Sequence, residues 1–183
     1  MQRKQINIPI SELRQLLSYD PDTGVVRWKE RSVDMFDDPR QANAWNGRFA
    51  GMFAGRRHPI KEYVQICVMR SMYQAHHLAW ALHYGELVPV DMELDHINHD
   101  PSDNRIENLR IATSSQNKRN RRAFKGKSSK YKGVSLIKSS GKWSAYLRIN
   151  GVMKNLGSFE TEEDAYAAYC SVAKELHGEF FHP

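Results

Sequence analysis

The sequence predicts an α+β protein, and two stretches of the chain carry that prediction. Residues 94–117 contain two short strand-like runs around a turn rich in Asp, Asn and Pro, followed by a basic run of helical character. Residues 130–183 contain three short strand-like runs and then one alanine-rich helical run. We therefore expect a hairpin followed by a helix in the middle of the chain. At the carboxyl end we expect a three-stranded antiparallel sheet packed on one helix.

The composition favours an intracellular protein with a polyanionic partner. A chain of 183 residues suits one domain or two small ones. A formal net charge of +6 and a pI near 9.3 make nucleic acid the first candidate. Cys67 and Cys170 lie far apart and form no Cys-x-x-Cys pair, so we expect neither structural zinc nor a disulfide framework. Because no apolar run could cross a bilayer and the amino terminus lacks a signal-peptide core, we expect a cytoplasmic protein without a membrane partner.

Residues 1–60 are expected to form an accessory region. Ser11–Tyr19 predicts a short amphipathic helix, and the turn DPDTG then leads into a strand over Val25–Lys29. Glycines and polar residues interrupt any period in residues 31–59, so we expect a loop there. Its arginines could follow a DNA backbone, although a solvated surface explains them equally well.

The next block predicts two strands and a helix. Residues 62–74 read as two strands joined by a tight turn, and AHHLAWALHYG predicts a helix that ends at Gly85. His76 and His77 open this helix. His76 could assist at a nearby site or hold the helix against the following hairpin, and we favour the structural role.

Polar residues suited to phosphodiester hydrolysis gather in the stretch from Leu94 to Asn117. Asp95 and His96 are adjacent, and two asparagines follow at Asn108 and Asn117. Hydrolysis of a phosphodiester needs a base to deprotonate water and a divalent cation to stabilise charge on oxygen. Asp and Asn oxygens suit magnesium, so this stretch supplies both requirements.

The spacing of this stretch also predicts its shape. Leu94–Ile97 can form one strand, an Asp- and Asn-rich turn follows, and Leu109–Ala112 can form the returning strand. A basic helix to about Arg122 would follow. A hairpin and helix so joined would bring Asp95 and Asn117 to one cation while His96 points at the adjacent water, which is a ββα-metal site.

The stretch resembles HNH endonucleases, also called His-Me finger nucleases. It is similar to the homing branch encoded by phages and introns, in which asparagine replaces the last histidine of the motif. The resemblance implies a nuclease domain over residues 61–122, with Asp95 and Asn117 as metal ligands. It implies His96 as general base and Asn108 as the asparagine of the catalytic set that braces the hairpin. The implied cofactor is a divalent metal, Mg²⁺ first and Mn²⁺ second.

This sequence departs from the family pattern at one pair of residues. In many phage HNH proteins a His-Arg pair opens the helix before the motif, whereas here the pair is His76 and His77. An imidazole is a poor substitute for a guanidinium fork, so the phosphate contact of that arginine is not expected here.

A basic run follows the motif and leads into a linker. Eight basic residues and no acidic one lie between Lys118 and Lys132, and residues 123–129 contain Gly and Ser typical of a flexible linker. A charge run is often only a solvated face. Because this one continues from the expected metal-site helix, we expect a phosphate clamp formed by Lys118, Arg119, Arg121 and Arg122.

The strand-like runs of residues 130–183 are YKGVSLIK, KWSAYLRIN and VMKNLGSF. Asn150-Gly151 is a strong hairpin signal between the second and third runs. Thr161 and Asp164 then have capping-box spacing at the start of the final helix, which Gly178 ends. This pattern predicts the sheet and helix of the carboxyl-terminal domain.

This segment resembles the plant ethylene-response-factor (Apetala-type) DNA-binding domain, which also occurs fused to HNH nucleases. The matching residues are Tyr131, Lys132, Gly133, Val134, Gly141, Lys142, Trp143, Leu156, Gly157 and Phe159. In that family the exposed sheet face enters the major groove. The resemblance therefore implies DNA contacts at Lys132, Ser135, Tyr146, Arg148 and Asn155.

Together these patterns predict a metal-dependent endonuclease that nicks or cuts duplex DNA, of the homing type. A single site implies a monomer that nicks. Two alternatives stay open: a non-catalytic, sequence-specific DNA-binding regulator with a relict HNH fold, and a structural RNA-binding protein. If a phage encodes the chain, the cell in which it acts would be the bacterial host.

Overall fold

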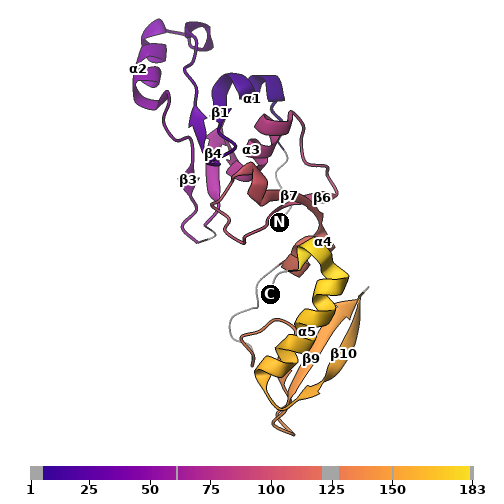
Figure 1. Cartoon of the computed structure of the whole chain (residues 1–183). Helices are drawn as coiled ribbons and strands as arrows, with labels where there is room; N and C mark the ends of the chain where they lie inside the picture. The colour runs from indigo at the N-terminus through magenta and orange to yellow at the C-terminus, as the bar shows by residue number, and fades with distance from the viewer. Residues whose placement is uncertain (1–5, 61, 121–127, 150, 182–183) are drawn as a thin grey trace. The chain divides into compact units, whose positions relative to one another are not determined.

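The computed structural model describes residues 6–60, 62–120, 128–149 and 151–181 (Figure 1). The chain divides into two compact units, Met1–Thr113 and Ser114–Pro183. The first unit contains the Asp95–His96 pair, and the second contains the carboxyl-terminal sheet.

The first unit begins with a helix that leads directly into a hairpin. Helix α1 (Ile10–Leu16) ends where β1 (Leu17–Tyr19) begins, and β1 pairs antiparallel with β2 (Val26–Trp28). A helix over all of Ser11–Tyr19 was expected, and that prediction is wrong for its last three residues. Leu17 is buried but lies opposite Trp28 on a strand, because pairing with β2 satisfies its backbone better than another helical turn.

A second helix replaces the loop expected over residues 31–59. After a short turn of 3₁₀ helix, η1 (Val33–Met35), helix α2 runs from Pro39 to Phe49. The carboxylate of Asp38 accepts a hydrogen bond from the backbone N–H of Arg40, and Pro39 occupies the first helical position. The loop prediction was wrong because it weighed the glycines above this start signal.

The rest of the first unit is a small sheet, a helix and a second hairpin. The sheet has the order β3-β4-β5, with β3 (Arg56–Arg57), β4 (Val64–Val68) and β5 (Ser71–Gln74). Helix α3 (Ala75–Tyr84) follows and ends at Gly85, whose φ of 74° is left-handed. The antiparallel hairpin is β6 (Met92–His96) and β7 (Leu109–Thr113), with the 3₁₀ turn η2 (Ile106–Asn108) before β7.

Buried side chains from both sides of residue 60 share one core. Leu13 and Leu17 of the amino-terminal segment lie in the same cluster as Ile66 and Leu78. A boundary at residue 60 is predicted from the sequence, whereas this packing joins the two sides. The amino-terminal elements are therefore part of the body that carries the β6–β7 hairpin.

The second unit is a helix, a three-stranded antiparallel sheet and a longer helix. Its elements are α4 (Ser114–Asn120), β8 (Val134–Leu136), β9 (Trp143–Ile149), β10 (Val152–Phe159), α5 (Glu162–His177) and the 3₁₀ turn η3 (Gly178–Phe180). The sheet order is β10-β9-β8. Helix α5 packs on one face, where Ala145 and Leu147 lie in a core with Ala165 and Tyr169. Thr161 caps α5, because its hydroxyl oxygen accepts from the backbone N–H of Asp164 at 3.1 Å.

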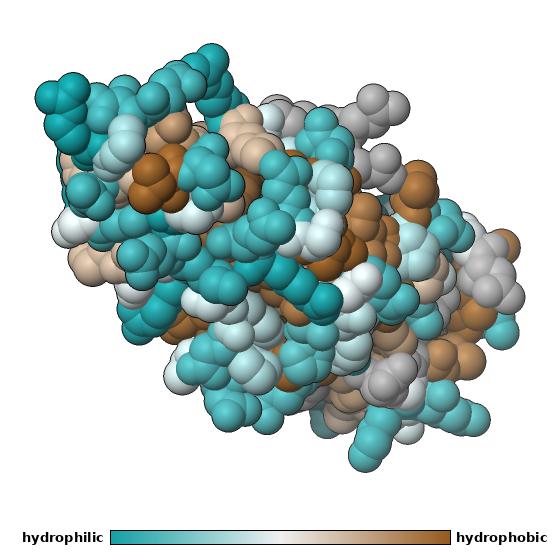
Figure 2. Space-filling model, turned by 90° about the horizontal axis from the view of Figure 1, so that it is seen from above, coloured by the Kyte–Doolittle hydropathy of each residue, from teal (hydrophilic) through white to brown (hydrophobic). Residues whose placement is uncertain are grey.

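The face of the chain seen in Figure 2 is largely polar. Figure 2 shows hydrophilic residues over much of one face, with apolar residues in smaller groups between them. In the described parts of the chain, no helix is both long and apolar enough to cross a membrane.

Candidate active site

The Asp95–His96 pair lies at the end of β6, on a hairpin that packs against α3. Leu94 of β6 and Leu109 of β7 share a core cluster with Ala79 and Trp80 of α3. The register sets Asp95 opposite Arg110 and His96 opposite Leu109. Asp95 and His96 are 6% and 7% exposed, so both polar side chains are taken out of water and require compensating contacts.

Arg110 provides that compensation for Asp95. Its Nε and Nη2 both donate to Asp95 Oδ2, at 3.1 and 3.0 Å, across the two strands. Asp95 is buried and the side chain of Arg110 is only 13% exposed, so the ion pair is well shielded from water and costly to break. Sequence reasoning missed Arg110. The signal that could have found it is a basic residue in the returning strand, opposite the acid in the expected register.

His96 makes contacts with a neighbouring ring and a side-chain amide. Its Nε2 lies 3.2 Å from Oδ1 of Asn104, and its ring meets that of His76 edge-on at 4.8 Å between centroids. Burial lowers the pKa of His96, and the Asn104 hydrogen bond and the Asp95 charge oppose that shift only in part. The imidazole is therefore neutral at neutral pH, the state that a general base needs.

Asn108 braces the connection between the two strands. Its Oδ1 accepts from the backbone N–H of Asn98 at 3.0 Å, and its Nδ2 donates to the backbone oxygen of Asp103 at 2.8 Å. Its own backbone oxygen accepts from Ile97 N–H at 2.9 Å. These contacts hold the loop that connects Ile97 to β7, and Asn108 itself is 5% exposed.

The loop between the strands has a second brace at Asp103. Its carboxylate accepts from Asn98 Nδ2 at 2.7 Å and from Nε and Nη2 of Arg105 at 2.9 and 2.8 Å. These hydrogen bonds, those from Arg105 first, lower the pKa of Asp103 to about 2. The carboxylate is therefore charged under all working conditions, and it stiffens the loop.

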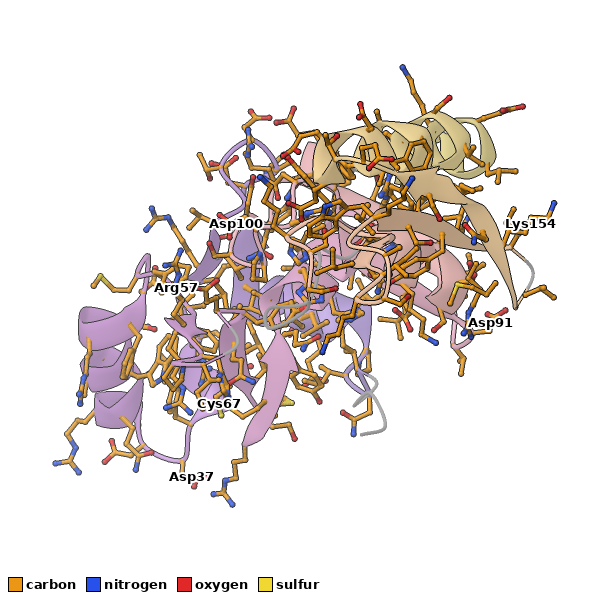
Figure 3. All side chains as sticks on the ribbon, turned by 90° about the horizontal axis from the view of Figure 1, so that it is seen from below. Asp37, Arg57, Cys67, Asp91, Asp100 and Lys154 are labelled. Atoms are coloured by element: carbon orange, nitrogen blue, oxygen red, sulfur yellow. The ribbon has the colours of Figure 1, made fainter. Side chains whose placement is uncertain are left out.

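Strand β3 reaches the same loop. Arg57 donates from Nη2 to the hydroxyl of Ser102 at 2.7 Å, and its charge also lowers the pKa of Asp100 after the larger effect of Ser102. Figure 3 labels Arg57 and Asp100, which come from segments far apart in the sequence. An arginine of the expected loop thus contacts the hairpin, which no local pattern in residues 31–59 indicates.

His76 and His77 lie at the start of α3. His76 is 3% exposed, and its ring is 4.6 Å from that of His77 and 5.5 Å from that of Tyr63. The His76 ring therefore contacts both His77 and His96. This position suits a supporting role for His76.

The residues predicted to hold a metal have the right donor chemistry. A buried carboxylate at Asp95 and an amide oxygen at Asn117 are hard ligands that fit Mg²⁺ or Mn²⁺. Within the described ranges, no three His, Cys, Asp or Glu side chains cluster as a zinc site would require. Asn117 lies on α4 in the second unit, so its role as a ligand stays a prediction.

Four of the nine residues predicted to contact DNA lie on one face of the second unit's sheet. Tyr146 lies opposite Asn155, and Ser135 opposite Ser144, in the strand register. Because side chains alternate between faces, these residues and Arg148 lie on the face opposite Ala145 and Leu147, which α5 covers. The structure therefore places four of the predicted contacts together: Ser135, Tyr146, Arg148 and Asn155.

The structure describes only some of the predicted basic contacts outside the sheet. Lys132 precedes β8 and is half-buried, and burial lowers its pKa. Lys118 is exposed on α4. The side chain of Arg119, and Arg121 and Arg122 entirely, lie outside the described residues.

The segment that contains α3, the β6–β7 hairpin and most of α4 has a recognisable family. Residues 73–119 match the family described as HNH endonuclease. The chain therefore contains an HNH endonuclease domain, which confirms the family predicted from the Asp95–His96 motif.

Two viral proteins are similar to the chain. It is 37% identical over 110 residues to an uncharacterized HNH endonuclease of Acanthamoeba polyphaga mimivirus, a match that covers 60% of this chain and 56% of that protein. It is 30% identical over 93 residues to Protein 3.8 of Escherichia phage T7, which covers 51% of this chain and 76% of that protein. The chain thus spans little more than half the length of the mimivirus relative. No solved structure matches it.

Proposed function

We propose that the protein is a metal-dependent endonuclease that hydrolyses phosphodiester bonds in duplex DNA. The observation that carries this proposal is the buried Asp95–His96 pair, in which the acid is held by Arg110 and burial keeps the histidine neutral. It lies inside the segment that matches the HNH endonucleases. A neutral imidazole next to a fixed carboxylate is what water activation beside a cation requires.

Each residue of the site has a separate role in the reaction. His96 takes a proton from the attacking water, and the resulting hydroxide attacks phosphorus. The bond to the 3′ oxygen then breaks and that oxygen takes a proton from solvent water, which leaves a 5′ phosphate and a 3′ hydroxyl. Asp95 and Asn117 would hold the divalent cation, which when bound stabilises negative charge on the leaving oxygen. Arg110 keeps the Asp95 carboxylate oriented for that task.

The second unit is the proposed reader of the duplex. Its sheet face with Tyr146, Arg148 and Asn155 is polar and lies opposite the face covered by α5. This arrangement supports the role implied by the resemblance to ethylene-response-factor domains. Charged side chains on such a face would contact phosphates, and polar ones would read base edges. A homing-type enzyme would use such a reader to select a long site.

Plasmid cleavage tests the proposal. Supercoiled plasmid is incubated with the protein in Mg²⁺, in Mn²⁺ and in excess chelator, and nicked and linear products are separated on a gel. We expect nicked circles only with metal, and a loss of about a hundred- to ten-thousand-fold in rate for His96→Ala. His83→Ala, an exposed histidine on α3, is the matched control and should cut normally. Full activity in chelator, or in His96→Ala, would contradict the proposal.

A further inference from the structure

Asn104 is a buried side chain that the proposed reaction does not yet use. It is 3% exposed, and its Oδ1 lies 3.2 Å from Nε2 of His96. A carbonyl oxygen can only accept a hydrogen bond, so this contact requires a proton on Nε2. In the neutral imidazole the other nitrogen, Nδ1, then carries the lone pair.

We propose that Asn104 is a positioning residue that fixes the ring and tautomer of His96, so that Nδ1 is the basic nitrogen, and that the amino-terminal hairpin holds Asn104 in place. The inference rests on the proposed function, because it needs His96 to be the base. It gives the amino-terminal segment a task in catalysis that no motif in that segment indicates.

The backbone of Asn104 is tied to the first hairpin by a hydrogen bond. The hydroxyl of Tyr19, at the end of β1, donates to the backbone oxygen of Asn104 at 2.8 Å. Burial, with the nearby Asp20 charge second, raises the pKa of Tyr19, so the hydroxyl keeps its proton. The next residues are tied as well, because Ile106 N–H donates to the backbone oxygen of Pro21 at 3.1 Å.

The turn after β1 packs directly against Asn104. Gly24 is buried there with a φ of 71°, and a Cβ at this position would lie 2.6 Å from the carbonyl carbon of Asn104 and 2.5 Å from the Arg105 nitrogen. Only glycine fits so close a contact between two backbones. The turn therefore packs closely against the backbone of Asn104.

The turn is itself held by internal hydrogen bonds. The carboxylate of Asp20 accepts from the backbone N–H of Asp22 at 3.0 Å and from the hydroxyl of Thr23 at 2.7 Å. The backbone N–H of Gly24 donates to the backbone oxygen of Asp20 at 2.9 Å. A hydrogen-bonded turn, a close backbone contact and a tyrosine hydrogen bond thus fix Asn104. His76 packs edge-on against the His96 ring at 4.8 Å.

The test compares two substitutions at Asn104 in the full chain. Asn104→Asp keeps an oxygen acceptor, whereas Asn104→Leu keeps the size and removes it. We expect Asn104→Leu to lower kcat for plasmid nicking by roughly 10- to 100-fold with KM for DNA unchanged, as loss of an orienting partner does. Asn104→Asp should recover most of that loss. The Tyr19→Phe variant, which removes only the hydroxyl, should lower kcat a few-fold in the same manner.

The second readout is the ring proton itself, observed by ¹⁵N-edited NMR of the metal-free protein labelled at histidine. We expect wild type and Asn104→Asp to show a slowly exchanging proton on His96 Nε2, and Asn104→Leu to lose it. A ring proton on Nδ1 in the wild type would overturn the inference, and so would a folded Asn104→Leu protein with wild-type kcat. If Asn104→Leu fails to fold, the tautomer of His96 in the wild type and the kcat of Tyr19→Phe still test the inference.

The outcomes also separate this inference from the proposed function. If His96→Ala cuts as well as wild type, the proposed function fails. If His96→Ala is inactive while Asn104→Leu is fully active, the general base stands and only the role of Asn104 is lost.

Discussion

At the scale of single residues, three buried polar side chains of the site each have a partner from another part of the hairpin. Asp95 has Arg110, His96 has Asn104, and Asn108 has the backbone of the loop. Such pairs matter because an unpaired polar group in a low-dielectric site costs more than a paired one contributes. The consequences are measurable for the base and for its neighbouring acid.

The pH dependence of cleavage should report the environment of His96. Burial lowers its pKa from the ordinary histidine value of about 6.5, and the base must be neutral to accept a proton. The rate should therefore rise with pH, reach half its maximum below pH 6.5, and stay flat through neutrality. Measuring kcat from pH 5 to 8 at saturating Mg²⁺ tests this. A midpoint above 6.5 would show that burial does not dominate.

Removing the partner of Asp95 should destabilise the first unit. Arg110→Ala leaves a buried carboxylate without its guanidinium, which should cost about 3 kcal/mol in the free energy of unfolding. Thermal and urea denaturation of the full chain would measure it. Arg48→Ala, which removes an exposed arginine on α2, is the control and should change stability little. Equal stability of the two variants would contradict the role given to the ion pair.

At the scale of elements, local signals predicted some parts of the fold well and others poorly. The strands and the capped helix of the second unit follow from alternation and from the Thr161–Asp164 spacing, and the structure has these elements. Helix α2 was missed although Asp38-Pro39 starts it, because glycines downstream outweighed that signal. Element type thus depends on which of two competing local signals tertiary packing favours.

The cap of α5 should have a measurable effect. Thr161→Ala removes the oxygen that accepts from Asp164 N–H, which should lower the stability of the second unit by about 1 kcal/mol. Ser171→Ala, at an exposed position inside the same helix, should not destabilise it. Thermal denaturation, monitored by a spectroscopic signal that reports on the second unit, would compare the stabilities of the two variants. Equal loss in both variants would mean that the cap contributes nothing.

At the scale of the whole molecule, one unit is expected to cut and the other to read. The sheet of the second unit provides an internal control, because the basic side chains on its two faces are expected to differ in their contact with DNA. Arg148 is exposed on the face opposite α5, whereas Lys154, also exposed, lies opposite Leu147 in the register and so shares the face on which α5 packs. Only Arg148 is placed for contact with a duplex on the open face.

The salt dependence of DNA binding should distinguish these two residues. Arg148→Ala should flatten the plot of log affinity against log salt by about 0.9 if the guanidinium touches one phosphate. Lys154→Ala should leave the slope unchanged. Fluorescence anisotropy with a labelled duplex over a series of salt concentrations measures both. The same loss of slope in the two variants would show that general charge, and not the open face, binds DNA.

The sequence alone determined the HNH family and the position of the proposed metal ligand and base, because Asp95 and His96 are neighbours and the turn chemistry after them is local. Only the tertiary structure decided what holds them. Arg110 is 15 residues from Asp95, Asn104 is 8 from His96, and Tyr19 is 85 from Asn104. No periodicity or motif connects residues at such separations. Their meeting depends on strand register, on the close approach of Gly24 and on one core shared across residue 60.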